Sequence, residues 1–152
     1  MTEELSVRIV QLDGMHVASA HGFGAEPEMI AVGKITGWAA DQGLQQPRFF
    51  GFNNPDPHPG SPNYGYEAWV QVAEPGSAEE GITYKEFTGG LYAVTRAQGV
   101  EEIYPTWGRL VTWCEGSPYV MAEHQWLEEH FYEDGKYEYP VYIDLYLPVR
   151  EG

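Results

Sequence analysis

The chain has 152 residues, enough for one domain of ordinary size, and 43% of them are hydrophobic, which argues against a disordered chain. It carries 23 acidic and 8 basic residues, a formal net charge of −15, and the basic residues are scattered. That charge repels phosphate backbones, so the composition predicts a protein that does not bind nucleic acid by itself. The single cysteine, Cys114, excludes an internal disulfide and favours a reducing compartment.

No targeting or membrane segment is expected. The first ten residues, MTEELSVRIV, lack the basic stretch followed by an apolar stretch that is typical of a signal peptide. No apolar run approaches the ~20 residues that span a bilayer. The sequence therefore predicts a cytoplasmic protein without a membrane partner.

The chain opens with two predicted strands. Residues 5–12 alternate apolar and polar side chains, as a strand does. Asp13 and Gly14 are typical of a two-residue hairpin turn, and residues 15–24 are expected to return as the second strand of that hairpin.

Two amphipathic helices are expected. Pro27 stands in the first turn of a helix that ends at Gly43, and its apolar stripe is Ala31, Ile35, Trp38 and Ala39. The second helix is predicted over residues 100–115, with the stripe Ile103, Trp107, Leu110, Val111 and Cys114. Further strands are expected at residues 48–53, 66–74, 82–87, 91–97, 125–131 and 140–149, with a turn at Gly89-Gly90.

The predicted elements repeat. Strand, helix, strand, strand runs over residues 15–73 and again over residues 90–149, and Trp38 in the first helix corresponds to Trp113 in the second. The order predicts an α+β fold in which the two halves form one antiparallel sheet with two principal helices on it. A groove between two such halves is a usual place for a ligand.

Most catalytic and cofactor motifs are absent from the sequence. It has no phosphate loop, no dinucleotide-binding fingerprint and no nucleophile elbow. His124 and His130 are six residues apart, which is not the spacing of a zinc-binding helix, and Cys114 has no second cysteine. We therefore expect no metal and no cofactor.

Aromatic residues make up 14% of the chain, with 5 Trp, 11 Tyr and 6 Phe, and so many rings suggest a lined cavity. Glu128 and Glu129 lie among the rings of Trp126 and Phe131. A carboxylate among rings is a physical means of holding an organic cation. Neighbours in a strand face opposite sides, so only one of the two glutamates can point inward. The alternative is that both are solvated at an exposed strand end.

The chain resembles the GyrI-like family, which includes effector-binding domains of AraC-type and other multidrug-responsive regulators. The resemblance is carried by RFFGFN with a proline-rich loop and YGYEAWVQV, by GLYAVTRAQG leading into IYPTWGRLVTWC, by E-x-F-x-x-D at Glu129, Phe131 and Asp134, and by IDLYLPV near the end. It covers about residues 6–149, so residues 1–152 are expected to form a single effector-binding domain.

The resemblance implies a site between the two halves for bulky aromatic, often cationic, compounds. It places the pocket glutamate at Glu129, and Phe131 stands where tyrosine is common in the family. The rings that it implies around the ligand are Trp38, Tyr66, Trp69, Tyr92, Trp107, Phe131 and Tyr142.

Three functions fit these features. The leading interpretation is a stand-alone binding module, since the repeat leaves no room for a helix-turn-helix in these residues. The second is a hydrolase of strained electrophiles such as cyclopropane-containing toxins, a reaction known in the resembled family, with Glu129 as general base. The third is an acidic regulator that imitates DNA toward a basic protein partner such as a topoisomerase.

Overall fold

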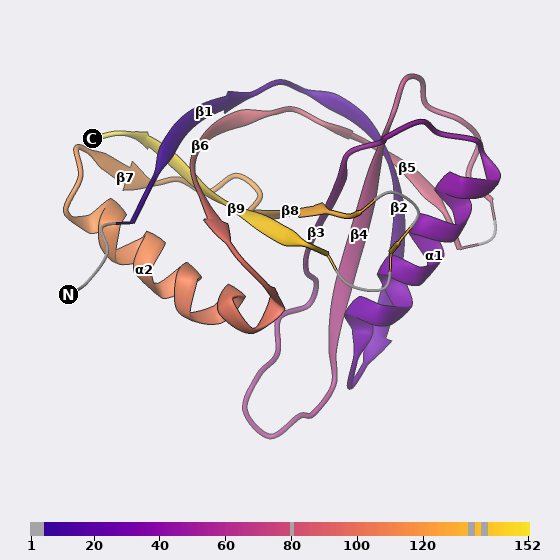
Figure 1. Ribbon diagram of the computed structural model, residues 1–152, viewed down its shortest axis with the longest axis horizontal. Helices are drawn as coiled ribbons and strands as arrows, with labels where there is room; N and C mark the ends of the chain where they lie inside the picture. The colour runs from indigo at the N-terminus through magenta and orange to yellow at the C-terminus, as the bar shows by residue number, and fades with distance from the viewer. Residues whose placement is uncertain (1–4, 80, 134–135, 138–139) are drawn as a thin grey trace. The chain divides into compact units, whose positions relative to one another are not determined.

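The computed structural model describes residues 5–79, 81–133, 136–137 and 140–152, so Asp134 of the E-x-F-x-x-D run lies outside the described residues (Figure 1). The fold is α+β, and the described strand pairs are antiparallel, as predicted. The chain divides into two compact units, residues 15–87 and residues 1–14 with 88–152. We call them the middle unit and the outer unit.

The middle unit contains one helix and four strands. Its elements are β2 (Met15–Gly24), α1 (Pro27–Asp41), β3 (Phe49–Asn53), β4 (Tyr64–Val72) and β5 (Thr83–Phe87). The strands lie in the order β5-β2-β4-β3. The helix packs on β2 and β4 through Ala31, Ile35 and Ala39, which are buried as the apolar stripe predicted.

Small side chains bring α1 close to the middle sheet. A Cβ atom on Gly22 of β2 would lie 2.5 Å from the carbonyl oxygen of Pro27 and 2.7 Å from Cβ of Ile30. The neighbouring inward positions of β2 are Ala18 and Ala20, both buried. The glycine therefore sets the distance between helix and sheet.

The outer unit repeats this arrangement. Its elements are β1 (Arg8–Leu12), β6 (Gly90–Ala97), a 3₁₀ turn (Val100–Glu102), α2 (Ile103–Glu115), β7 (Tyr119–Met121), β8 (Leu127–Phe131) and β9 (Tyr142–Glu151). The strands lie in the order β1-β6-β9-β8, and β7 pairs with the far end of β9. Leu110 and Cys114 of α2 pack against Ile143, Leu145 and Leu147 of β9. The predicted duplication is confirmed, because the two units share one strand order: β1, β6, β9 and β8 correspond to β5, β2, β4 and β3.

The hairpin predicted for residues 5–24 is wrong. Leu12 of β1 pairs with Gly90 of β6, and Met15 of β2 pairs with Phe87 of β5, so neither Asp13-Gly14 nor Gly89-Gly90 closes a hairpin. Gly89 has φ +82°, and a side chain there would meet the backbone of residues 12–14. Turn chemistry does not decide which strands pair: β1 pairs with β6 within the outer unit, and β2 pairs with β5 within the middle unit.

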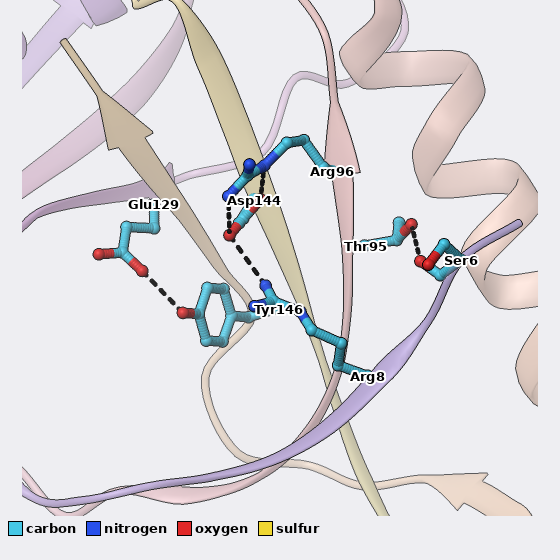
Figure 2. A network of polar contacts seen from close by, with 7 residues as sticks. All are labelled: Ser6, Arg8, Thr95, Arg96, Glu129, Asp144 and Tyr146. Atoms are coloured by element: carbon cyan, nitrogen blue, oxygen red, sulfur yellow. Dashed lines mark hydrogen bonds and ion pairs between the residues drawn. The ribbon is translucent and has the colours of Figure 1, made fainter.

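Smaller differences concern element ends. The second helix begins at Ile103 because residues 100–102 form the 3₁₀ turn, and β4 begins at Tyr64, two residues earlier than expected. Strand β7 was not predicted, since its three residues are too few to show an alternation. Thr95 of β6 donates a hydrogen bond to the carbonyl of Ser6 at 2.7 Å, which holds the segment before β1 (Figure 2).

We predict that Gly22→Ala destabilises the protein and that Gly37→Ala does not. The new methyl group at Gly22 meets backbone atoms of α1, and such overpacking costs about 1–3 kcal/mol. Gly37 lies inside α1 with open space around its Cβ position, so alanine there favours the helix by at most about 1 kcal/mol. Urea unfolding of both variants measures the difference, and equal free energies of unfolding would contradict the close approach.

Candidate functional site

In each unit the helix covers one face of the strands, and we call the opposite face the distal face. In the outer unit, α2 packs on Ile143, Leu145 and Leu147, so the alternate residues of β9 lie on the distal face. The strand registers extend that face to β1, β6 and β8. Its polar and aromatic members are Arg8, Tyr92, Arg96, Glu129, Phe131, Tyr142, Asp144 and Tyr146.

Glu129 is a buried carboxylate on this distal face. It lies in the middle of β8, paired with Asp144 of β9, and is 3% exposed. The hydroxyl of Tyr146 donates a hydrogen bond to its Oε1 atom at 2.7 Å (Figure 2). Burying a carboxylate requires such donors, since desolvation alone is costly. Phe131, two residues along the strand, lies on the same face.

Asp144 is the second buried acid of the distal face, and two arginines bind it. Nε of Arg96 lies 2.8 Å from Oδ1, its Nη2 lies 3.3 Å from Oδ2, and Nη2 of Arg8 lies 3.0 Å from Oδ2 (Figure 2). The fork of Arg96 thus meets both oxygens, the stronger geometry for a guanidinium and a carboxylate. This ion-paired cluster joins β1 and β6 to β9.

The guanidinium of Arg96 also covers two rings of this face. Its central carbon lies 3.8 Å from the ring centroid of Tyr142 and 5.4 Å from that of Phe131. The two rings themselves are 4.8 Å apart at 35°. The hydrogen bonds to Asp144 raise the pKa of Arg96, with smaller contributions from the charges of Asp144, Tyr142 and Glu129, while burial acts in the opposite direction. The rings and acids here accept a planar cation.

Tyr92 of β6 belongs to the same face. It is fully buried, its hydroxyl donates to the carbonyl of Gln125 at 2.5 Å, and its ring meets those of Tyr146 and His124 edge-on. Burial raises the pKa of Tyr92 far above its ordinary value of 10.0. Four of the predicted site residues, Tyr92, Glu129, Phe131 and Tyr142, therefore share one face.

Trp107 lies on the other side of that sheet. Its indole nitrogen, on α2, donates to Oε2 of Glu128 at 3.1 Å, and its ring packs against Trp126 at 5.2 Å. The two neighbouring glutamates thus face opposite sides of β8, as strand geometry requires. The structure brings Trp107 together with Glu128 and not with the distal face that holds Glu129.

The remaining predicted rings belong to the middle unit. Trp69 of β4 lies on its distal face, edge-on to Phe52 at 5.1 Å and tilted toward Phe87 at 5.6 Å. Tyr66 faces α1 instead, and its ring fills the space above Gly51. Trp38, on α1, packs edge-on against Tyr84 and donates to Glu79.

Glu67 is a buried acid that the sequence analysis missed, beside Trp69 on the distal face of the middle unit. It is 3% exposed. Its carboxylate accepts hydrogen bonds from Lys85 at 2.6 Å, Trp69 at 2.6 Å, Ser19 at 2.9 Å and Asn54 at 3.1 Å. Burial by itself raises the pKa of Glu67, but these donors outweigh it and hold the pKa below its ordinary value of 4.5. The signal that could have found it is a lone charge inside the apolar strand YGYEAWVQV.

The described residues contain no group of three or more His, Cys, Asp or Glu side chains that could hold a metal ion. His124 has its Nε2 atom 2.8 Å from the carbonyl oxygen of Leu91, and Nδ1 of His130 lies 3.0 Å from the hydroxyl of Tyr132. Dense protein surroundings lower the pKa of His130 to about 4, although its side chain keeps some solvent exposure. Among the described residues, no helix is both long and apolar enough to cross a membrane.

The family model of integron-associated effector binding proteins matches residues 8–149. The chain belongs to this family. The predicted GyrI-like resemblance is thereby confirmed, and the match places the chain among effector-binding proteins. No curated protein sequence matches the chain.

Solved structures share the fold at low sequence identity. The C-terminal domain of EcmrR matches with a TM-score of 0.72 at 13% identity, over 97% of this chain and 99% of that one. In a complex of EcmrR with DNA, the chain spans 58% of the EcmrR chain, with a TM-score of 0.77 at 12% identity over 97% of this chain. A hydrolase from Listeria innocua matches with a TM-score of 0.64 at 12% identity, over 98% and 94%. SAV2435 bound to tetraphenylphosphonium matches with a TM-score of 0.52 at 11% identity, over 96% and 94%.

We predict that Glu67→Gln costs about 1–3 kcal/mol of stability at neutral pH, because an amide cannot accept all four donors and faces Lys85 without a charge. The pKa of Glu67 is lowered by folding, so its contribution is fully present above the unfolded-state pKa and is lost as the pH falls through the folded-state pKa. The gap between wild type and variant should therefore close below pH 4.5. Urea titrations between neutral and acidic pH measure it.

Glu86→Gln is the matched control for this prediction. Glu86 follows Lys85 on β5 and is exposed, so its loss should leave the stability nearly unchanged at every pH. A gap for Glu67→Gln that persists undiminished at acidic pH would mean that shape, and not charge, makes Glu67 important.

Proposed function

We propose that the protein is a binding module for bulky aromatic cations, held on the distal face of the outer unit around Glu129. The observation that carries the proposal is the buried carboxylate of Glu129, which shares its face with the rings of Tyr92, Phe131, Tyr142 and Tyr146. Family membership supports effector binding in general, and the bound tetraphenylphosphonium of SAV2435 supports this chemical class of ligand.

Charge and rings act together in such a site. The carboxylate attracts a positive ligand strongly because few water molecules surround it to weaken the field. Each ring face adds roughly 0.5–2 kcal/mol of cation–π attraction, depending on desolvation. The hydroxyl of Tyr146 keeps the carboxylate in a fixed orientation at 2.7 Å. A large delocalised cation with apolar groups satisfies both requirements.

Trp69 is proposed as an aromatic ligand contact within the middle unit. It lies on the distal face of the middle unit, between Phe52 and Phe87, and its indole nitrogen is held by Glu67 at 2.6 Å. That bond fixes the ring plane, so the ring offers a rigid apolar surface to a ligand. Trp38 and Trp107 lie on the helices of their units and Tyr66 faces α1, so these three rings are proposed to support the fold behind these surfaces.

We predict that Glu129→Gln weakens the binding of tetraphenylphosphonium about tenfold or more, which corresponds to about 1.4 kcal/mol. The amide keeps the shape and can still accept the bond from Tyr146, while the charge is lost. Tryptophan fluorescence titration measures the affinity. Neutral triphenylphosphine oxide, which also carries phenyl rings, should lose little.

Glu128→Gln is the matched control, since it removes the same charge one residue away and on the α2 side, where Trp107 holds it. Equal effects of the two variants would show that the overall negative charge, and not this carboxylate, attracts the cation. Equal losses for the cation and the neutral compound would assign Glu129 a packing role.

Hydrolysis is the second candidate function, favoured by the hydrogen bond between Tyr146 and Glu129 and by the fold shared with a hydrolase. Glu129 would take a proton from water as the oxygen attacks a strained cyclopropane carbon. The ring bond breaks, its electron pair goes to the other carbon, and that carbon takes the proton back from Glu129. Turnover of an activated cyclopropane, abolished in Glu129→Gln, would establish the enzyme. Binding without turnover would support the binding module and not the enzyme.

A further inference from the structure

The distal face of the outer unit already holds a cation of its own. The guanidinium of Arg96 lies over the rings of Tyr142 and Phe131, at 3.8 and 5.4 Å, and its nitrogens meet both oxygens of Asp144. Two ring faces and one carboxylate are the parts of a binding site for a planar, delocalised cation. We call Phe131, Tyr142 and Asp144 the guanidinium cradle.

We propose that the guanidinium cradle is a second cation subsite, which Arg96 fills as an internal competitor of cationic ligands. The inference rests on the proposed function, because the two rings are among those assigned to the ligand and Glu129 is paired with Asp144 across β8 and β9. The ligands that it admits are those that carry a guanidinium-like or amidinium-like group, and aromatic cations whose rings can pack on Tyr142 and Phe131 once Arg96 has left.

Arg96 can leave the cradle without stranding a buried charge. Asp144 is 2% exposed, and breaking a buried ion pair is costly when it leaves a charge alone. Here Arg8 binds Oδ2 of the same carboxylate at 3.0 Å, so Asp144 keeps a partner when Arg96 moves. The side chain of Arg96 is 41% exposed, so solvent can receive its charge.

Arg8 provides the matched control. Both arginines bind Asp144, and both carry one positive charge on the same face, but of the two it is Arg96 whose guanidinium is recorded over rings. Arg96→Met and Arg8→Met therefore change the net charge equally and leave Asp144 with one arginine each. A difference in ligand affinity between the two variants therefore measures the effect of uncovering the rings.

The first experiment measures tetraphenylphosphonium binding to wild type, Arg96→Met and Arg8→Met by fluorescence titration. We expect Arg96→Met to bind about tenfold more tightly than wild type, which is about 1.4 kcal/mol, and Arg8→Met to change by less than about threefold. Equal factors for the two variants would overturn the proposal, because the charge alone would then explain the effect. Unchanged or weaker binding by Arg96→Met would also overturn it.

The second experiment tests the cradle without tetraphenylphosphonium. Its result is therefore informative even if neither wild type nor Glu129→Gln binds tetraphenylphosphonium and the proposed function is wrong. Methylguanidinium at low millimolar concentration is added to Arg96→Ala and Arg8→Ala, and the unfolding temperature is followed. A ligand that binds the folded state raises it. A rise in Arg96→Ala and none in Arg8→Ala supports the cradle. No rise in either, or equal rises in both, overturns it.

Arg96→Lys keeps a cation beside Asp144 but loses the flat fork that meets both oxygens and covers the rings. It is the variant to use if Arg96→Met or Arg96→Ala does not fold. If Arg96 competes with the ligand through its planar group, Arg96→Lys should bind tetraphenylphosphonium more tightly than wild type does. Wild-type affinity in Arg96→Lys would show that any positive charge at this position serves, and would overturn the proposal.

Discussion

Burying a carboxylate inside a protein requires hydrogen-bond donors around it, and this constraint organises the distal faces of both units. Glu67, Glu129 and Asp144 are each at most 3% exposed. Glu67 collects four donors, Asp144 collects two arginines, and Glu129 takes the hydroxyl of Tyr146. Several of these donors come from other strands, such as Lys85 of β5 for Glu67 and Arg8 of β1 for Asp144, so each acid joins neighbouring strands through its side chain.

The helix of each unit explains why the acids lie where they do. In the outer unit, α2 buries an apolar row of β9, and strand alternation then places every second residue on the opposite face. Polar and aromatic side chains lie there beside buried apolar ones such as Val94 and Leu127. The same alternation places Glu128 on the face toward α2 and its neighbour Glu129 on the distal face.

The three acids are not equivalent. Glu67 is saturated by donors that include a lysine, and Asp144 is held by two guanidinium groups, so both are suited to holding strands and rings in place. Glu129 accepts a hydrogen bond from the hydroxyl of Tyr146 and shares its face with several rings, which is the arrangement that the proposed cation site uses. The arginine over Tyr142 and Phe131 shows that these rings already take part in cation binding within the chain.

The sequence by itself determined the duplication, the α+β class and most of the element positions, because alternation and helical stripes are local patterns. It also determined that Glu129 and Phe131 share a face opposite to Glu128, since that follows from a period of two. Only the tertiary structure decided which strands pair and which side chains bind each other. It pairs β1 with β6 where a hairpin was expected, joins Arg8 to Asp144 across 136 residues and surrounds Glu67 with donors from four places in the chain. Such contacts depend on which strands meet in a sheet, and no local pattern of residues encodes that.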